Sequence, residues 1–173
     1  GDPIGLLGGL NSYIYVRGSP ILLMDQSGLY TAVVVNGPTS GNPFGHAAIA
    51  VSGSGAYSFG NTTPLGSSFT DYLAREAPRR DTEIRIIPTT PEQEDKILDY
   101  LRKQKDDVGY FDNCAVRTHN ALRAGGVYLR DPYATPGFPE GVRRGMNNMP
   151  GTTVTIPRFG TVPNELSDFN QKR

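Results

Sequence analysis

The only cysteine of the chain, Cys114, is the side chain best suited to covalent chemistry. It follows an Asp-Asn pair and opens a predicted helix that ends at two glycines, so it lies in the first helical turn. Unpaired N–H groups and the positive end of the helix dipole favour a thiolate there and lower the thiol pKa. The same N–H groups can stabilise the oxyanion that forms when sulfur attacks a carbonyl. The sequence therefore predicts a nucleophile, which needs a nearby base.

His46 is the better of the two histidines for the role of base. It opens a predicted strand in which alternation places His46, Ala48 and Ala50 on one face. The two alanines leave room for the Cys114 helix to pack directly over that face, and this packing would bring the thiol to the imidazole. His119 lies about 140° away from Cys114 around the helix and is expected to point elsewhere.

Each of these residues also has an ordinary structural interpretation. A lone cysteine is commonly a small buried apolar side chain, and a lone histidine at the start of a strand is commonly structural. The glycine before His46 and the asparagine before Cys114, at a helix start, favour catalysis over these alternatives.

These motifs resemble the circularly permuted papain-like enzymes, which include NlpC-type cell-wall peptidases and the lecithin–retinol acyltransferase group. Gly45-His46 leads a strand of small residues, and Asn113-Cys114 opens a helix much later, in the order found in that superfamily. The similarity covers about residues 44 to 126. It implies a permuted papain-like fold with Cys114 as nucleophile, His46 as general base, and a polar third residue on the strand after the histidine strand.

The third residue departs from the pattern of the acyltransferase group, where it is commonly a second histidine. The corresponding strand of this chain reads Ala-Tyr-Ser-Phe. Ser58 is the predicted residue for orienting His46, with Tyr57 and Asn61 as alternatives, although Ser58 is also interpretable as a plain strand hydroxyl. A serine orients the ring but stabilises an imidazolium less than a carboxylate does. Asn113 and Tyr57 are candidates for stabilising the oxyanion or for positioning.

The surrounding elements predict an α+β domain, a small antiparallel sheet packed against helices. β-branched and apolar segments predict strands, at residues 30–35, 46–51, 56–59, 82–87 and 152–156. Apolar spacing and capping residues predict helices, at residues 67–77, 91–104 and 114–124. The segment 127–173 is rich in Pro and Gly and is expected to wrap the surface, with a disordered polar tail over the last ten residues.

Composition narrows the classes of function. The chain has 17 Lys plus Arg and 17 Asp plus Glu, so no net positive field attracts it to nucleic acid, and a nuclease is disfavoured. One cysteine excludes an internal disulfide framework, and neither a metal nor another cofactor is expected. No apolar run approaches the roughly 20 residues that a membrane helix needs, and no signal peptide is recognised. Export is therefore expected to depend on a carrier.

The first 29 residues resemble the end of the RHS-repeat-associated core, the β-rich shell that encloses polymorphic toxins. The resemblance rests on Asp2-Pro-Ile-Gly, on Asn-Ser-Tyr-Ile-Tyr, and on Asp25-Gln-Ser-Gly-Leu. In that family the core releases its toxin by cleavage after Gly-Leu, using aspartates. The resemblance implies a boundary at the bond between Leu29 and Tyr30, with Asp2 and Asp25 as the matching aspartates. Gln26 replaces the usual proline, and most of the shell is missing, so no cleavage is expected from this fragment alone.

Residues 1–29 are accordingly interpreted as a shell remnant and residues 30–173 as a toxin domain, with its catalytic part at about 30–126. We predict an antibacterial or host-directed effector, a cysteine hydrolase that cleaves an amide bond of a peptidoglycan peptide or a protein through a thioester. The alternatives are a lipid acyl hydrolase or acyltransferase of the same fold, and a nuclease-type toxin delivered by an RHS carrier.

The expected partners are the RHS shell and a cognate immunity protein that covers the cleft between Cys114 and His46. Nucleic acid and membrane are not expected partners. The domain is expected to be secreted and delivered into a target cell, with type VI secretion as the route and the periplasm or cytoplasm as the place of action.

Overall fold

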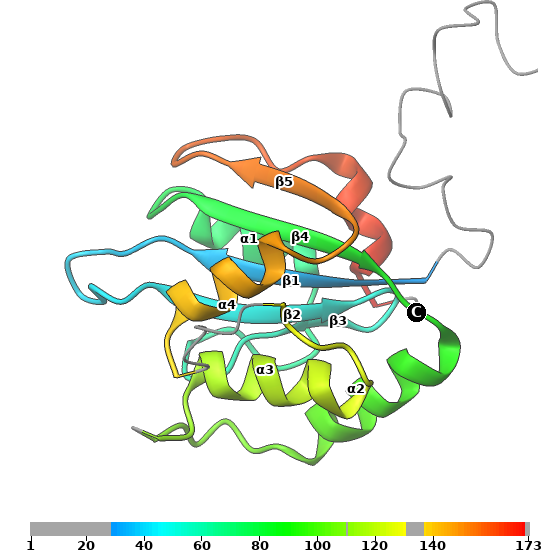
Figure 1. Cartoon of the computed structure of the whole chain (residues 1–173). Coiled ribbons are helices and arrows are strands. Elements are labelled where there is room, and N and C mark those ends of the chain that lie inside the picture. The colour runs from blue at the N-terminus through cyan, green and yellow to red at the C-terminus, as the bar shows by residue number, and fades with distance from the viewer. Residues whose placement is uncertain (1–28, 110, 131–136, 172–173) are drawn as a thin grey trace, which may run out of the picture.

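A five-stranded antiparallel sheet forms the centre of the computed structural model, which describes residues 29–109, 111–130 and 137–171 (Figure 1). The strand order is β3-β2-β1-β4-β5. The strands are β1 (Tyr30–Asn36), β2 (His46–Val51), β3 (Gly55–Tyr57), β4 (Thr82–Pro88) and β5 (Thr152–Ile156). The predicted α+β class with a small antiparallel sheet is confirmed.

Helices cover both faces of this sheet (Figure 1). The apolar cluster on one face takes residues from α2, α3 and α4, and the cluster on the other face takes residues from α1 and the 3-10 helix η3. The bounds are α1 (Phe69–Glu76), α2 (Pro91–Lys103), α3 (Cys114–Ala124), α4 (Pro139–Asn147) and η3 (Asn164–Phe169). Because both faces are covered, β1 and β2 are buried along their whole length and their sequences are almost continuously apolar.

The helix that carries Cys114 packs on the opposite face of β2 from the one predicted. Ala47 and Ile49 of β2 share a cluster with residues of α3, whereas Ala48 and Ala50 pack toward α1. The expectation that α3 covers the face of His46, Ala48 and Ala50 is therefore wrong. Both faces of β2 are buried and largely apolar, so alternation separates two sets of residues but does not say which helix each set meets.

The C-terminal segment is more ordered than predicted. Helix α4 buries Val142 and Met146 against the sheet, and η3 buries Leu166 and Phe169 beside α1. The Phe169 ring makes an edge contact with Phe69, with ring centroids 5.3 Å apart. The prediction of a disordered tail is wrong for residues 164–171, because two apolar residues within a polar stretch are enough to anchor it.

The predicted boundary between shell and toxin lies at the start of β1, the first strand of the described part of the chain. Tyr30 is the first residue of β1, and its N–H donates to Ser52 Oγ at 3.0 Å. The carbonyl of Leu29 accepts a hydrogen bond from the N–H of Thr89 at 3.2 Å. The rest of the predicted shell remnant, with its two aspartates, lies outside the described residues.

Candidate active site

Asn113 fixes the start of α3 and thereby the position of Cys114. Its Oδ1 accepts hydrogen bonds from the N–H groups of Ala115 and Val116 at 3.0 and 3.2 Å, as an N-cap does. Its Nδ2 donates to the carbonyl of Gly137 at 2.9 Å and ties α3 to the segment before α4. Of the two roles predicted for Asn113, this geometry fits positioning rather than oxyanion stabilisation.

Opposing effects act on the thiol of Cys114. Burial is the largest and raises its pKa, while the backbone N–H groups of Ala47, Ala115 and Cys114 itself, and the charge of Arg80, lower it. The net shift is upward, so the lowered pKa predicted from the helix dipole is wrong, because desolvation outweighs the dipole. The thiol therefore rests in its neutral form at neutral pH.

The amide of Ala47 meets the thiol because β3 is short. Pairing between β2 and β3 ends at Ile49 and Tyr57, so Ala47 lies just beyond the last pair of that ladder. The N-terminus of α3 approaches β2 at this point, where the sulfur of Cys114 interacts with the amide of Ala47, the residue after His46.

His46 is held at the start of β2 by close backbone packing on one side and by a hydroxyl on the other. Gly45 has a φ of 78°, and a Cβ at this position would lie only 2.5 Å from the carbonyl oxygen of Asn36, so glycine is required. The ring of His46 is buried, and its Nε2 lies 2.7 Å from Ser58 Oγ. Burial, with smaller effects from Arg80 and Arg79, lowers the pKa of His46 from 6.5 to about 4. The imidazole is thus neutral at pH 7, and Nδ1 is the ring nitrogen that does not face Ser58.

Of the three candidates for orienting His46, the structure brings Ser58 to the ring. Tyr57 pairs with Ile49, so the next residue falls on the face shared by His46 and Ala48. Tyr57 therefore points to the opposite face, into the cluster of α2 and α3, and is not among the described residues lining the pocket beside Cys114.

Asn61, the remaining candidate, is hydrogen-bonded elsewhere. Its Nδ2 donates to Glu76 Oε1 at 3.4 Å, and its Oδ1 accepts from the N–H of Thr63 at 2.6 Å.

Cys114 and His46 both lie at the end of β2 where the strand begins, on opposite faces of the strand. Among the described residues, the structure shows no hydrogen bond between the thiol and the imidazole. Pairs of nucleophile and base are often loose in the absence of substrate and tighten when it binds. The proximity rests on the Ala47 amide, which interacts with the thiol and directly follows His46.

A buried chain of polar groups continues behind Ser58. Tyr72 of α1 is hydrogen-bonded to Ser58, and its hydroxyl also accepts from Asn36 Nδ2 at 2.5 Å. Asn36 Oδ1 in turn accepts from Thr82 Oγ1 at 2.8 Å. Burial raises the pKa of Tyr72, which keeps its hydroxyl protonated. Sequence reasoning missed this chain, although a polar residue ending an apolar strand, as Asn36 does, is a signal for it.

A buried ion pair places a positive charge that acts on both His46 and Cys114. Arg80 Nε lies 2.5 Å from Glu76 Oε2, and Arg80 also donates to the carbonyl of Gly37 at 3.3 Å. The charge of Arg80 disfavours a protonated His46 and favours a thiolate at Cys114. The burial of Arg80 was not predicted from the sequence.

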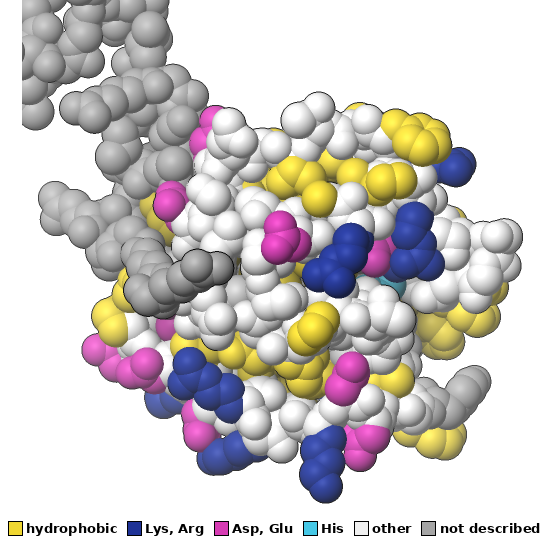
Figure 2. All heavy atoms as spheres, turned by 180° about the vertical axis from the view of Figure 1, so that it is seen from behind, with side chains coloured by type: hydrophobic (Ala, Val, Ile, Leu, Met, Phe, Trp, Pro, Cys, Tyr) yellow, Lys and Arg dark blue, Asp and Glu magenta, His cyan; other side chains and the backbone are white. Residues whose placement is uncertain are grey.

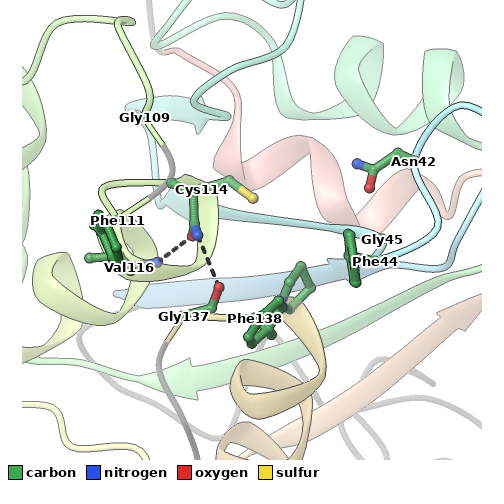
Figure 3. Close-up of a pocket in the computed structure, with 11 residues that line it drawn as sticks. Asn42, Phe44, Gly45, Gly109, Phe111, Cys114, Val116, Gly137 and Phe138 are labelled. Carbon is green, nitrogen blue, oxygen red and sulfur yellow. Dashed lines mark hydrogen bonds between the residues drawn. The ribbon is translucent and has the colours of Figure 1, made fainter.

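The thiol opens into a pocket of about 500 Å³ whose described lining carries no charged side chain. Three separate segments form it: the β1–β2 loop, the residues leading into α3, and the start of α4 (Figure 3). The rings of Phe44 and Phe138 lie 5.7 Å apart, and the sulfur of Cys114 points from α3 toward the β1–β2 loop (Figure 3). The described lining residues are Asn42, Phe44, Gly45, Gly109, Phe111, Asn113, Cys114, Val116, Gly137, Phe138 and Pro139.

Arg117 anchors one wall of this pocket. It is buried on α3, contacts both carboxylate oxygens of Asp112 at 3.0 and 2.8 Å, and lies 3.2 Å from Asp107 Oδ1. It also donates to the carbonyl of Lys105 and lies over the ring of Phe59, 5.1 Å from its centroid. The segment that carries Gly109 and Phe111 is thereby fixed to the helix of Cys114.

No protein-family model, curated protein or solved structure matches this chain. Within the described residues, no group of three or more His, Cys, Asp or Glu side chains is placed to hold a metal ion. No helix in the described part of the chain is long and apolar enough to cross a membrane. On the face shown in Figure 2, basic side chains are interspersed with acidic ones and do not form one continuous basic surface.

Proposed function

We propose that the chain is a cysteine hydrolase with a permuted papain-like arrangement, in which Cys114 is the nucleophile and His46 is the general base. The observation that carries this proposal is the convergence of two elements at the end of β2. The thiol lies beside the Ala47 amide and opens into the pocket, while the adjacent His46 is held through Nε2 by Ser58 at 2.7 Å. Nδ1 is then the ring nitrogen available for the proton of the thiol.

The reaction follows from two neutral partners. Because burial keeps the thiol and the imidazole uncharged, attack and proton transfer are coupled: Sγ bonds to the carbonyl carbon as its proton passes to His46. The imidazolium then protonates the leaving amine or alcohol, and a thioester remains on Cys114. Water attacks the thioester with His46 as base, which releases the carboxylic acid and restores the thiol.

Backbone groups at the same place suit the oxyanion that forms during attack. The N–H groups of Cys114 and Ala47 both interact with the sulfur, so a carbonyl oxygen bound beside it lies near both donors. The charge of Arg80 favours the negative charge that develops on sulfur.

The biological role proposed is that of an effector toxin carried by an RHS shell and countered by an immunity protein. Its support is the resemblance of residues 1–29 to the end of an RHS core, together with a sheet that begins at Tyr30. The papain-like resemblance favours an amide bond of peptidoglycan or protein as the target.

A growth assay in bacteria tests the hydrolase proposal. The full chain is expressed with and without a periplasmic export signal, beside the variants Cys114→Ala, His46→Ala and His119→Ala. His119→Ala is the matched control, since it removes the other histidine. We expect growth arrest to be lost in the first two variants and kept in the third, at equal protein levels. Arrest that persists in Cys114→Ala at wild-type abundance contradicts the proposal.

A further inference from the structure

The pocket beside Cys114 also constrains the substrate. Among the described lining residues, the polar side chains besides the thiol are Asn42 and Asn113, and the Asn113 amide already caps α3 and binds the Gly137 carbonyl. No described lining residue is charged. A ligand enclosed here meets mainly aromatic rings and backbone.

This lining disfavours a peptidoglycan stem peptide, which carries free carboxylates and amines. A charged group moved from water into a site without a counter-charge loses hydration that nothing replaces. Glu83, Glu140 and Arg143 line an adjoining pocket, where Arg143 is paired with both carboxylates. Asp112, which lies between two lining residues of the pocket beside Cys114, is paired with Arg117. The two pockets share Phe44, Gly45 and Pro139, which therefore lie between the apolar and the charged regions.

Three phenylalanines at the pocket favour a hydrocarbon chain instead. Phe44, Phe111 and Phe138 are 68%, 88% and 47% exposed, although exposed aromatic residues of this size are costly in water. They come from three different segments and converge on the same pocket as the thiol (Figure 3). Such convergence at a reactive group is what a site for an apolar ligand requires.

We infer that this pocket binds the acyl chain of a lipid ester, with the ester carbonyl at the thiol of Cys114. This inference rests on the proposed hydrolase function and specifies its substrate class. Sγ bonds to the acyl carbon as the thiol proton passes to His46, the carbon–oxygen bond breaks, and the leaving alcohol takes that proton. Water then cleaves the thioester and releases the fatty acid. The volume of about 500 Å³ lies within the roughly 300 to 1,000 Å³ typical of small-molecule sites.

The first test measures hydrolysis of p-nitrophenyl esters with acyl chains of two to twelve carbons. Each methylene buried in an apolar pocket favours binding about fourfold. We expect kcat/KM to rise by at least about tenfold from the four-carbon to the eight-carbon ester and then to level off. Phe138→Ser should flatten this rise, whereas Phe159→Ser should not, since Phe159 is 73% exposed and lies away from the pocket. Circular dichroism confirms that both variants are folded.

The second test measures binding without chemistry. A fluorescent fatty acid is titrated into Cys114→Ala and displaced with decanoate, and Phe138→Ser in the same background should weaken binding several-fold. A Cys114-dependent hydrolysis that ignores chain length, or an absence of fatty-acid binding to Cys114→Ala, overturns the acyl-chain inference and leaves the hydrolase proposal standing. Ester hydrolysis that survives Cys114→Ala contradicts the hydrolase proposal. The binding result alone then decides whether the pocket takes an acyl chain.

Discussion

Mild acid should destabilise the folded protein through His46. Burial, aided by Arg80, lowers the pKa of this histidine from 6.5 to about 4 in the folded state. In the unfolded chain the ring returns to its ordinary pKa, so the unfolded state binds more protons between pH 6.5 and pH 4. The free energy of unfolding therefore rises with pH through this window and falls as pH drops.

The two pKa values fix the size of the effect. Proton linkage with 6.5 unfolded and about 4 folded predicts a loss of about 2 kcal/mol between pH 7 and pH 5, and about 3 kcal/mol by pH 4. Between pH 7 and pH 5 the change in unfolding free energy reports mainly on His46. The carboxylates whose pKa is lowered in the folded state, Asp112 and Glu140 among them, lose their stabilising effect at lower pH.

Urea unfolding followed by far-UV circular dichroism at pH 7, 6 and 5 measures the loss. His46→Gln removes the titrating ring and retains a group able to bond to Ser58, so its unfolding free energy should depend on pH by about 2 kcal/mol less than that of the wild type. His119→Gln is the matched control, because burial lowers the pKa of His119 as well and this histidine also contributes to the pH dependence of unfolding. Equal pH dependence in the wild type and His46→Gln refutes the assignment of a buried, neutral His46.

Three further outcomes follow from the site. Tyr72→Phe removes a hydroxyl bonded to two buried partners and should lower the free energy of unfolding by about 1 to 3 kcal/mol. Tyr100→Phe, at a half-buried position of α2, should lower it less, and equal losses contradict the buried chain of polar groups. Because burial raises the pKa of Cys114, its alkylation by iodoacetamide should keep accelerating above pH 9, and a plateau below pH 8 contradicts a neutral resting thiol. Arg117→Met should speed amide hydrogen exchange across residues 105–112 but not in β1, and unchanged exchange refutes its role as the anchor of the pocket wall.

The sequence predicted the elements that carry strong local signals. Strand β2 and helix α3 have the predicted bounds, because alternation starts at His46 and an Asp-Asn pair precedes Cys114. Helix α2 is marked by Thr90, which forms a capping box with Gln93. Helix α4 was missed since glycines interrupt its apolar face, and η3 was missed since a short 3-10 turn has little periodicity.

The candidate site was predictable in its residue types but not in its environment. Ser58 was predicted from the papain-like resemblance, which implies a polar residue on the strand after the histidine strand, and the observed register puts it on the face of His46. Burial of Arg80 and the chain behind Ser58 depend on how α1 docks on the sheet, which no local pattern encodes. The predicted direction of the pKa shift of Cys114 was wrong for the same reason, since the position in the helix predicts the effect of the dipole but not that of desolvation.

The placement of α3 on the face away from His46 restricts where a catalytic pair can form. His46 lies on the α1 face of β2, and Cys114 approaches from the α3 face, so a helix lying flat over either face would keep the strand between them. The two can meet only around the end of β2, beyond the last pair of β2 and β3, where the Ala47 amide meets the thiol. Gly45 lets the chain turn closely past Asn36 at that end. The short β3 and the strained glycine are therefore as necessary to the proposed chemistry as the cysteine and the histidine.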